Sequence, residues 1–279
     1  MGSAIPVIRT LAPLREQIRR WRREGATVAL VPTMGALHEG HVDLVALARA
    51  RCTRVVASIF VNPAQFGPRE DFTRYPRDEA GDLAKLRHAG CDAVWSPDAT
   101  LMYPPGFATR ITPAGVAEGL ESDFRPHFFG GVATVCCKLF TQVLPDIAVF
   151  GEKDYQQLLV VRQMVRDLDL QLQIVAAPTR READGLAMSS RNAYLSPQER
   201  AVAPTLHQVL QTVARSGGRD AKVIAEGKKT LEAAGFRVDY LEVRDAETLT
   251  PVESGAARPL RALAAAWLGK TRLIDNIAI

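Results

Sequence analysis

The sequence predicts an α/β protein, a Rossmann-like doubly wound parallel sheet followed by a smaller C-terminal α+β domain. Through residue 177, short apolar runs suited to buried strands alternate with segments of helical periodicity. Residues 179–196 are polar and largely lack either periodicity. Beyond them, helical segments precede strand-like runs. We therefore expect residues 1–177 to form a catalytic domain and residues 178–279 a smaller lid domain.

In the first domain, each expected element rests on a local pattern. Residues 15–23 are basic with helical spacing, which predicts a solvated helix with Trp21 packed inward. The expected strands are residues 27–31, 55–61, 93–95, 147–150 and 172–176. The expected helices are residues 41–50, 79–89, 131–143 and 154–168. Strands alternating with helices predict a parallel sheet with helices on both faces.

In the second domain, we expect helices at residues 197–214 and 221–234 and strands at residues 238–243, 260–267 and 271–277. Residues 268–270 contain Gly269 between the last two strands, which is typical of a hairpin turn. The second domain is therefore predicted to be α+β.

The composition is that of an ordinary globular protein. Its 279 residues include 35 Lys and Arg against 31 Asp and Glu, a net charge of +4, with 47% hydrophobic residues. This excludes a disordered chain, and the charge is too small to indicate nucleic-acid or membrane binding. It fits recognition of a small anion. No signal peptide or long apolar run is present, which predicts a cytoplasmic protein, and the four cysteines lack metal or disulfide spacing, which predicts free thiols.

The most informative motif is Pro32-Thr33-Met34-Gly35-Ala36-Leu37-His38-Glu39-Gly40-His41, between the first buried strand and its helix. Helix N-termini at the carboxyl edge of such sheets bind phosphate, and His38 and His41 could donate to its oxygens. Gly40 would allow close approach. The spacing does not match the zincin motif, and neither a Walker loop nor a dinucleotide fingerprint is present. Surface histidines that merely cap the helix are the alternative.

Two further polar segments follow predicted strands. Residues 62–67 carry Asn62 and Gln65, whose amides can hold hydroxyls and a carboxylate, although an ordinary Asn-Pro turn is an alternative. Residues 151–157 carry Lys153, Asp154 and Gln157, which suit a phosphate site or a solvated charge run.

The loop at residues 178–192 lies at the expected domain junction. Ser189, Ser190 and Arg191 provide hydroxyl and guanidinium donors that suit a triphosphate, and the loop could act as a lid. A polar linker is an equal alternative.

Several of these blocks together resemble the pantothenate synthetase family, the pantoate–β-alanine ligases of the HxGH nucleotidylyltransferase superfamily. The resemblance rests on PTMGALHEGH (32–41), FVNPAQFG (60–67), YPRD (75–78), KLF (138–140), PDIAVFGEKDYQQ (145–157) and READGLAMSSRN (181–192). It implies that ATP and pantoate bind to the domain at residues 1–177 and form pantoyl adenylate and pyrophosphate, after which β-alanine attacks and AMP leaves. It also implies Mg²⁺ on the phosphates and a homodimer.

The resemblance also implies roles for individual residues. The catalytic residues would be His41, His38, Lys153, Ser189 and Arg191. The ATP-binding residues would be Pro32, Thr33, Met34, His38, Gly40, His41, Gly151, Lys153, Asp154, Arg180, Met188, Ser189, Ser190 and Arg191. Gln65, Gln157 and Asn62 would orient pantoate, and Asp82 would assist Mg²⁺ through water.

Two departures from the family pattern stand out. Arg180 occupies a position where the family commonly has valine beside adenine, and Cys136-Cys137 replaces a small or β-branched pair, which predicts core packing. Two other functions share these motifs: a nucleotidyltransferase without an amine acceptor, and a nucleotide-sensing protein that binds ATP without turnover.

Overall fold

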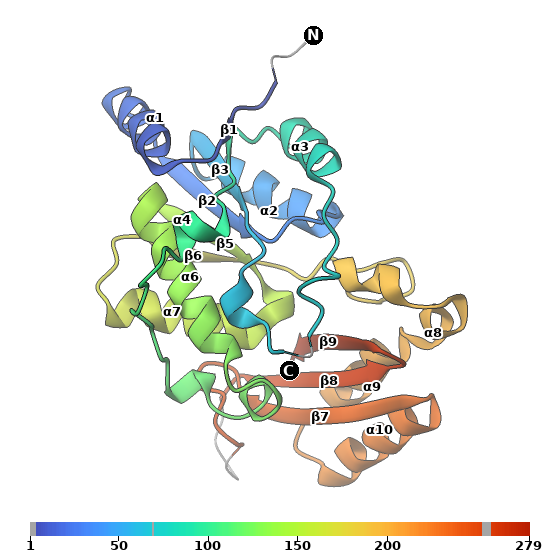
Figure 1. Cartoon of the computed structure of the whole chain (residues 1–279). Helices are drawn as coiled ribbons and strands as arrows, with labels where there is room; N and C mark the ends of the chain where they lie inside the picture. The colour runs from blue at the N-terminus through green and yellow to red at the C-terminus, as the bar shows by residue number, and fades with distance from the viewer. Residues whose placement is uncertain (1–3, 69, 253–257) are drawn as a thin grey trace.

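The computed structural model describes residues 4–68, 70–252 and 258–279. It contains a six-stranded sheet in the order β1-β4-β3-β2-β5-β6 and a three-stranded sheet in the order β7-β8-β9, which lies below the first in Figure 1. Neighbouring strands are parallel in the larger sheet and antiparallel in the smaller one. The predicted α/β class is therefore confirmed.

The strands of the larger sheet agree with the predicted apolar runs. They are β1 (Val7–Ile8), β2 (Val28–Thr33), β3 (Arg54–Ile59), β4 (Ala93–Trp95), β5 (Ile147–Gly151) and β6 (Gln173–Ala177). Only β1 was not predicted, because this edge strand has two residues, too few to show a periodic pattern. The chain builds outward from β2 through β3 to β4 and then returns to place β5 on the other side of β2. The order therefore reverses between β2 and β5, where such sheets bind ligands.

Helices cover both faces of this sheet. They are α1 (Leu11–Arg23), α2 (Glu39–Arg49), α3 (Glu79–His88), α4 (Ala99–Met102), α5 (Glu121–Phe124), α6 (Phe128–Val143) and α7 (Tyr155–Asp167). The short helices α4 and α5 were not predicted, since a single turn shows no amphipathic period. Alternation along β2 sends Leu30 to the face covered by α1, α6 and α7, and Ala29 and Val31 to the face covered by α2 and α3.

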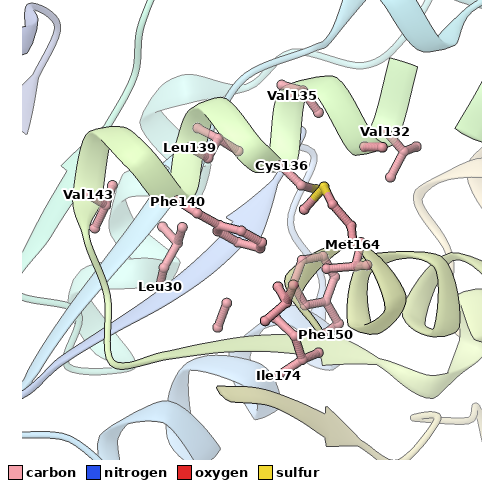
Figure 2. Packing of buried hydrophobic residues seen from close by; sticks show 14 of the residues in the cluster. Leu30, Val132, Val135, Cys136, Leu139, Phe140, Val143, Phe150, Met164 and Ile174 are labelled. Atoms are coloured by element: carbon pink, nitrogen blue, oxygen red, sulfur yellow. The ribbon is translucent and has the colours of Figure 1, made fainter. Parts of the chain in front are cut away.

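The core beneath α6 is shown in Figure 2. Leu30, Phe150 and Ile174 of three strands meet Phe140 of α6 and Met164 of α7 in this cluster. Cys136 lies in the same cluster, so its predicted role in core packing is confirmed. All four cysteines are free thiols, as predicted, but the expectation that free thiols would be buried holds for Cys52, Cys91 and Cys136 and not for Cys137, which is half-buried. Trp21 is buried on the inner side of α1.

The C-terminal part contains α8 (Pro197–Val202), α9 (Thr205–Arg215), α10 (Ala221–Ala233), β7 (Phe236–Asp245), β8 (Leu260–Leu268) and β9 (Thr271–Ala278). The prediction of one helix at residues 197–214 was wrong. Pro204 separates α8 from α9, because proline has no N–H to continue the helical ladder. The hairpin at Gly269 is confirmed, since Leu268 pairs with Thr271.

The smaller sheet lies between its own helices and the larger unit. One face packs on α9 and α10 through residues such as Leu210 and Leu231. The other packs Tyr240 and Leu263 against Leu159 of α7. The larger sheet ends at Ala177, where we expect the domain boundary, and the division into two domains stays a prediction. Within the described residues, no helix combines the length and apolar character needed to cross a membrane.

Candidate active site

A cavity of about 1210 Å³ lies at the carboxyl edge of the larger sheet and extends to the smaller sheet. It contains the loops that follow β2 and β5, the two strands between which the strand order reverses. Parallel topology thus brings together motifs that are more than a hundred residues apart in the chain (Figure 1).

The cavity lining includes every predicted site residue except Asp82. These residues are Pro32, Thr33, Met34, His38, Gly40, His41, Asn62, Gln65, Gly151, Lys153, Asp154, Gln157, Arg180, Met188, Ser189, Ser190 and Arg191. Their location is therefore known, whereas their individual roles stay predictions.

His38 and His41 form a capping box at the start of α2. The Nδ1 atom of His38 accepts the Gly40 N–H at 3.2 Å, and Nδ1 of His41 accepts the His38 N–H at 3.2 Å. Their ring centroids lie 4.2 Å apart. With each Nδ1 used as an acceptor, the neutral imidazoles carry their proton on Nε2. The two rings therefore cap the helix, but they are half-buried in the cavity lining and not surface histidines; their binding of phosphate stays a prediction.

Gly40 makes room for the cap. A Cβ atom on Gly40 would lie 3.0 Å from Cε1 of His38, closer than an ordinary contact. The missing side chain therefore admits the His38 imidazole, in addition to the close phosphate approach expected from the sequence.

Both histidines are neutral at pH 7. Burial, with smaller contributions from Lys153 and Lys85, lowers the pKa of His38 to about 4. Burial, followed by His38 and the same two lysines, lowers the pKa of His41 to about 3. The imidazoles therefore offer Nε2–H donors without positive charge, and the cationic groups near them are lysine ammoniums.

Lys153 faces this pair from the other side of the switch point. It lies in the 3₁₀ turn Glu152–Asp154 between β5 and α7. Its Nζ is 3.7 Å from Oδ2 of Asp154, and its side chain is 20% exposed. A partly buried ammonium beside two neutral donors suits an anion, because the desolvated charge is weakly screened.

Asn62 does not present free groups to the cavity. It is 1% exposed. Its Nδ2 donates to Oε1 of Gln65 at 3.0 Å and to the Gly131 carbonyl at 3.1 Å, while its Oδ1 accepts the Tyr103 hydroxyl at 2.6 Å. The expected direct contact of Asn62 with substrate is therefore not supported. Asn62 instead orients the Gln65 amide, whose Nε2 donates to Sδ of Met34 at 3.2 Å.

Arg191 is held by a partner that the sequence analysis missed. Its Nε and Nη2 donate to the two carboxylate oxygens of Asp71 at 2.9 and 3.0 Å. Although burial opposes it, this bidentate pair lowers the pKa of Asp71. The hydroxyls of Tyr75 and Ser190 are 3.2 Å apart, and Ser189 Oγ accepts the Arg191 N–H. Tyr75 belongs to the YPRD block at residues 75–78, so the sequence did contain a signal that this segment lies near the site.

Arg180 pairs with α2. Its Nη1 lies 3.2 Å from Oδ2 of Asp43, and its carbonyl accepts the Met188 N–H at 2.9 Å. Arg180 therefore ties the loop at residues 178–192 to the helix that carries His41.

Asp82 has a structural role. It is 2% exposed, and its Oδ2 and Oδ1 accept the backbone N–H groups of Ala36 and Leu37 at 2.9 and 2.7 Å. It thus holds the loop between β2 and α2, and nothing supports the expected water-mediated metal contact. Among the described residues, no group of three or more His, Cys, Asp or Glu side chains is arranged to hold a metal ion.

Two neutral imidazoles, a lysine and an arginine lie around the switch point of a parallel sheet, which is the arrangement of an enzyme that acts on an anionic substrate. The chain belongs to the pantoate–β-alanine ligase family, whose sequence model matches residues 6–278. It is a ligase that forms pantothenate from pantoate and β-alanine.

Curated relatives and solved structures agree with this assignment. The pantothenate synthetase of Bradyrhizobium sp. (strain BTAi1) is 58% identical over the whole of both chains. The pantothenate synthetase structure from Thermus thermophilus has a TM-score of 0.91 and 48% identity, covering 98% of this chain and 99% of that one. A Francisella tularensis pantoate–β-alanine ligase, solved with βγ ATP and β-alanine, has a TM-score of 0.83 and 30% identity over 99% and 98% of the chains.

Proposed function

We propose that this chain forms pantothenate in two steps within the one cavity. A pantoate carboxylate oxygen attacks the α-phosphorus of ATP, the bond to the β-phosphate oxygen breaks, and pyrophosphate leaves. The β-alanine amine then attacks the acyl carbon of pantoyl adenylate, loses a proton, and expels AMP. The Francisella relative, solved with an ATP species and β-alanine, supports ATP and β-alanine as ligands of this cavity.

His38, His41 and Lys153 would stabilise the first step. The negative charge that develops around the α-phosphorus needs donors already in place, since reorienting them during the reaction costs free energy. The neutral Nε2–H groups and the Lys153 ammonium meet that need, and their positions across the switch point would align the two anionic reactants. With a pKa of about 3 in the free protein, His41 would act first as a neutral donor to the leaving group.

The remaining residues would hold the substrates. Gln65, oriented by Asn62, and Gln157 would bind pantoate hydroxyls and carboxylate. Pro32, Thr33, Met34, Gly40, Gly151, Asp154, Arg180 and Met188 would line the nucleotide.

Ser189, Ser190 and Arg191 would bind the β- and γ-phosphates. Arg191 must exchange the Asp71 carboxylate for phosphate oxygens, which have a similar fork of acceptors.

Mg²⁺ would enter on the ATP phosphates. The described residues offer no carboxylate cage, and Mg²⁺ commonly keeps waters and substrate phosphates as ligands, so we assign no protein ligand and derive no step from it. A homodimer, a cytoplasmic location, and a lid formed by residues 178–279 belong to the same proposal, on the basis of the family resemblance.

One observation carries the proposal: the histidine pair and Lys153, from distant parts of the chain, line one cavity. The test is isotope exchange of pyrophosphate into ATP, which should require pantoate but not β-alanine, whereas AMP release should require both. Exchange without pantoate would refute the adenylate step.

A further inference from the structure

Asn276 of β9 holds the turn that carries Lys153. Its side-chain Nδ2 donates to the carbonyl oxygens of Glu152 and Lys153 at 3.0 and 2.8 Å. Its Oδ1 accepts the Nε–H of Arg261 at 2.7 Å. Asn276 is 3% exposed; its bond to Arg261 is buried, and its two bonds to the turn are partly buried.

Arg261 of β8 completes the contact. Its Nη2 donates to Oε2 of Glu152 at 3.1 Å, and its guanidinium lies 4.0 Å from the centroid of the Tyr155 ring. The smaller sheet therefore contacts three parts of the segment that carries the proposed catalytic ammonium. It binds the backbone carbonyls of Glu152 and Lys153, the carboxylate of Glu152 and the ring of Tyr155.

The turn has no equivalent support from its own segment. Neither the 3₁₀ turn Glu152–Asp154 nor α7 has a side-chain hydrogen bond at its N-terminal cap. Without Asn276, the Glu152 and Lys153 carbonyls would lose these two donors beside a helix start that no side chain caps, and the backbone of Lys153 would be held less firmly.

We propose that Asn276, oriented by Arg261, is a positioning residue for the ligase reaction: it fixes the backbone of Lys153 so that the ammonium meets the reacting phosphate. The inference rests on the role proposed above for Lys153. A displacement of about 1 Å at a reacting group can cost roughly 10²-fold in rate. The smaller sheet thus contributes to catalysis by holding the turn that carries Lys153.

The test is a double-mutant cycle of Asn276→Asp with Lys153→Ala, read by pantoate-dependent pyrophosphate exchange. The aspartate keeps the acceptor for Arg261 and removes both N–H donors to the turn. In the parent, Asn276→Asp should lower kcat by about 10- to 100-fold and change the KM values for ATP and pantoate less than about threefold. In the Lys153→Ala background, the same change should cost less than about twofold.

Tyr155→Phe is the matched control. It removes one hydrogen bond of the same junction, from the Tyr155 hydroxyl to the Ala246 carbonyl at 2.8 Å, but leaves the ring beneath Arg261 and the bonds of Asn276. It should keep kcat within about twofold while costing the stability of about one hydrogen bond. If Asn276→Asp does not fold, Arg261→Lys replaces it in the cycle, because lysine lacks the Nε–H that orients the amide.

A parental kcat in Asn276→Asp, with Lys153→Ala strongly impaired, overturns the positioning role and leaves the proposed function standing. An equal loss in both backgrounds shows a general structural role and also overturns it. A parental rate in Lys153→Ala overturns the role proposed for Lys153 and, with it, this inference.

Discussion

Replacing His41 with alanine should separate its two roles, in folding and in catalysis. The imidazole accepts the His38 N–H at 3.2 Å, and loss of a helix cap costs about 0.5–2 kcal/mol of unfolding free energy. The same change removes the buried Nε2–H donor from the cavity. Loss of one such preorganised donor costs about 10²- to 10³-fold in rate, or roughly 2.7–4 kcal/mol of transition-state stabilisation.

The measurements are pantoate-dependent pyrophosphate exchange and urea unfolding, with His41→Gln as the matched variant. Glutamine at this third helical position can restore the cap, since a glutamine there is one of the ordinary partners in a capping box. We therefore expect His41→Gln to recover most of the stability but not the exchange rate. Exchange within about threefold of the parent in His41→Ala would refute the catalytic role.

Three further predictions follow from the geometry. Because the pKa values of His38 and His41 lie below 6.5, the unfolded chain takes up protons first on acidification. The free energy of unfolding should therefore fall below about pH 6.5, by up to about 1.4 kcal/mol per pH unit and histidine, and urea titrations of a His38→Asn/His41→Asn variant should lose that slope. Gly131→Ala would place a Cβ atom against the Ala64 carbonyl oxygen, which should lower the free energy of unfolding by about 1–3 kcal/mol and raise the KM for pantoate by displacing Gln65. Gly130→Ala is the control, because its Cβ atom would lie 3.5 Å from its nearest neighbour. Equal stability of the two variants in thermal unfolding would contradict the clash. Amide hydrogen exchange in the loop 181–192 should slow when ATP binds, most at Ser189 and Ser190, since the N–H groups of Glu182, Gly185 and Arg191 already donate within the loop; unchanged rates would count against closure.

The fold was largely predictable from local patterns. Strand β4 coincides with the predicted residues 93–95, because a short apolar run before a proline has few alternatives. The error at residues 197–214 arose because the apolar period continues across Pro204 while the backbone does not. The two-residue strand β1 and the one-turn helices are stabilised by tertiary contacts, so no period marks them.

The site was predictable where one segment carries the chemistry. The capping box needs only His38, Gly40 and His41, which are neighbours in the chain. The partners of these segments were not predictable. Asp71 holds Arg191 across 120 positions, and Asn276 reaches Lys153 across 123. Asn62 and Asp82 carry polar atoms that suit substrate or metal. In the folded protein both side chains are buried, and these atoms form hydrogen bonds with other groups of the chain.

The sequence by itself determined the alternation of strands and helices, the polar motifs that line the cavity and the family, because each depends on residues close together in the chain. Only the tertiary structure decided that the order of strands reverses between β2 and β5, which places His41 and Lys153 on one cavity. It also decided the charge state of the site. Burial makes both imidazoles neutral, and burial is a property of packing that no local pattern contains.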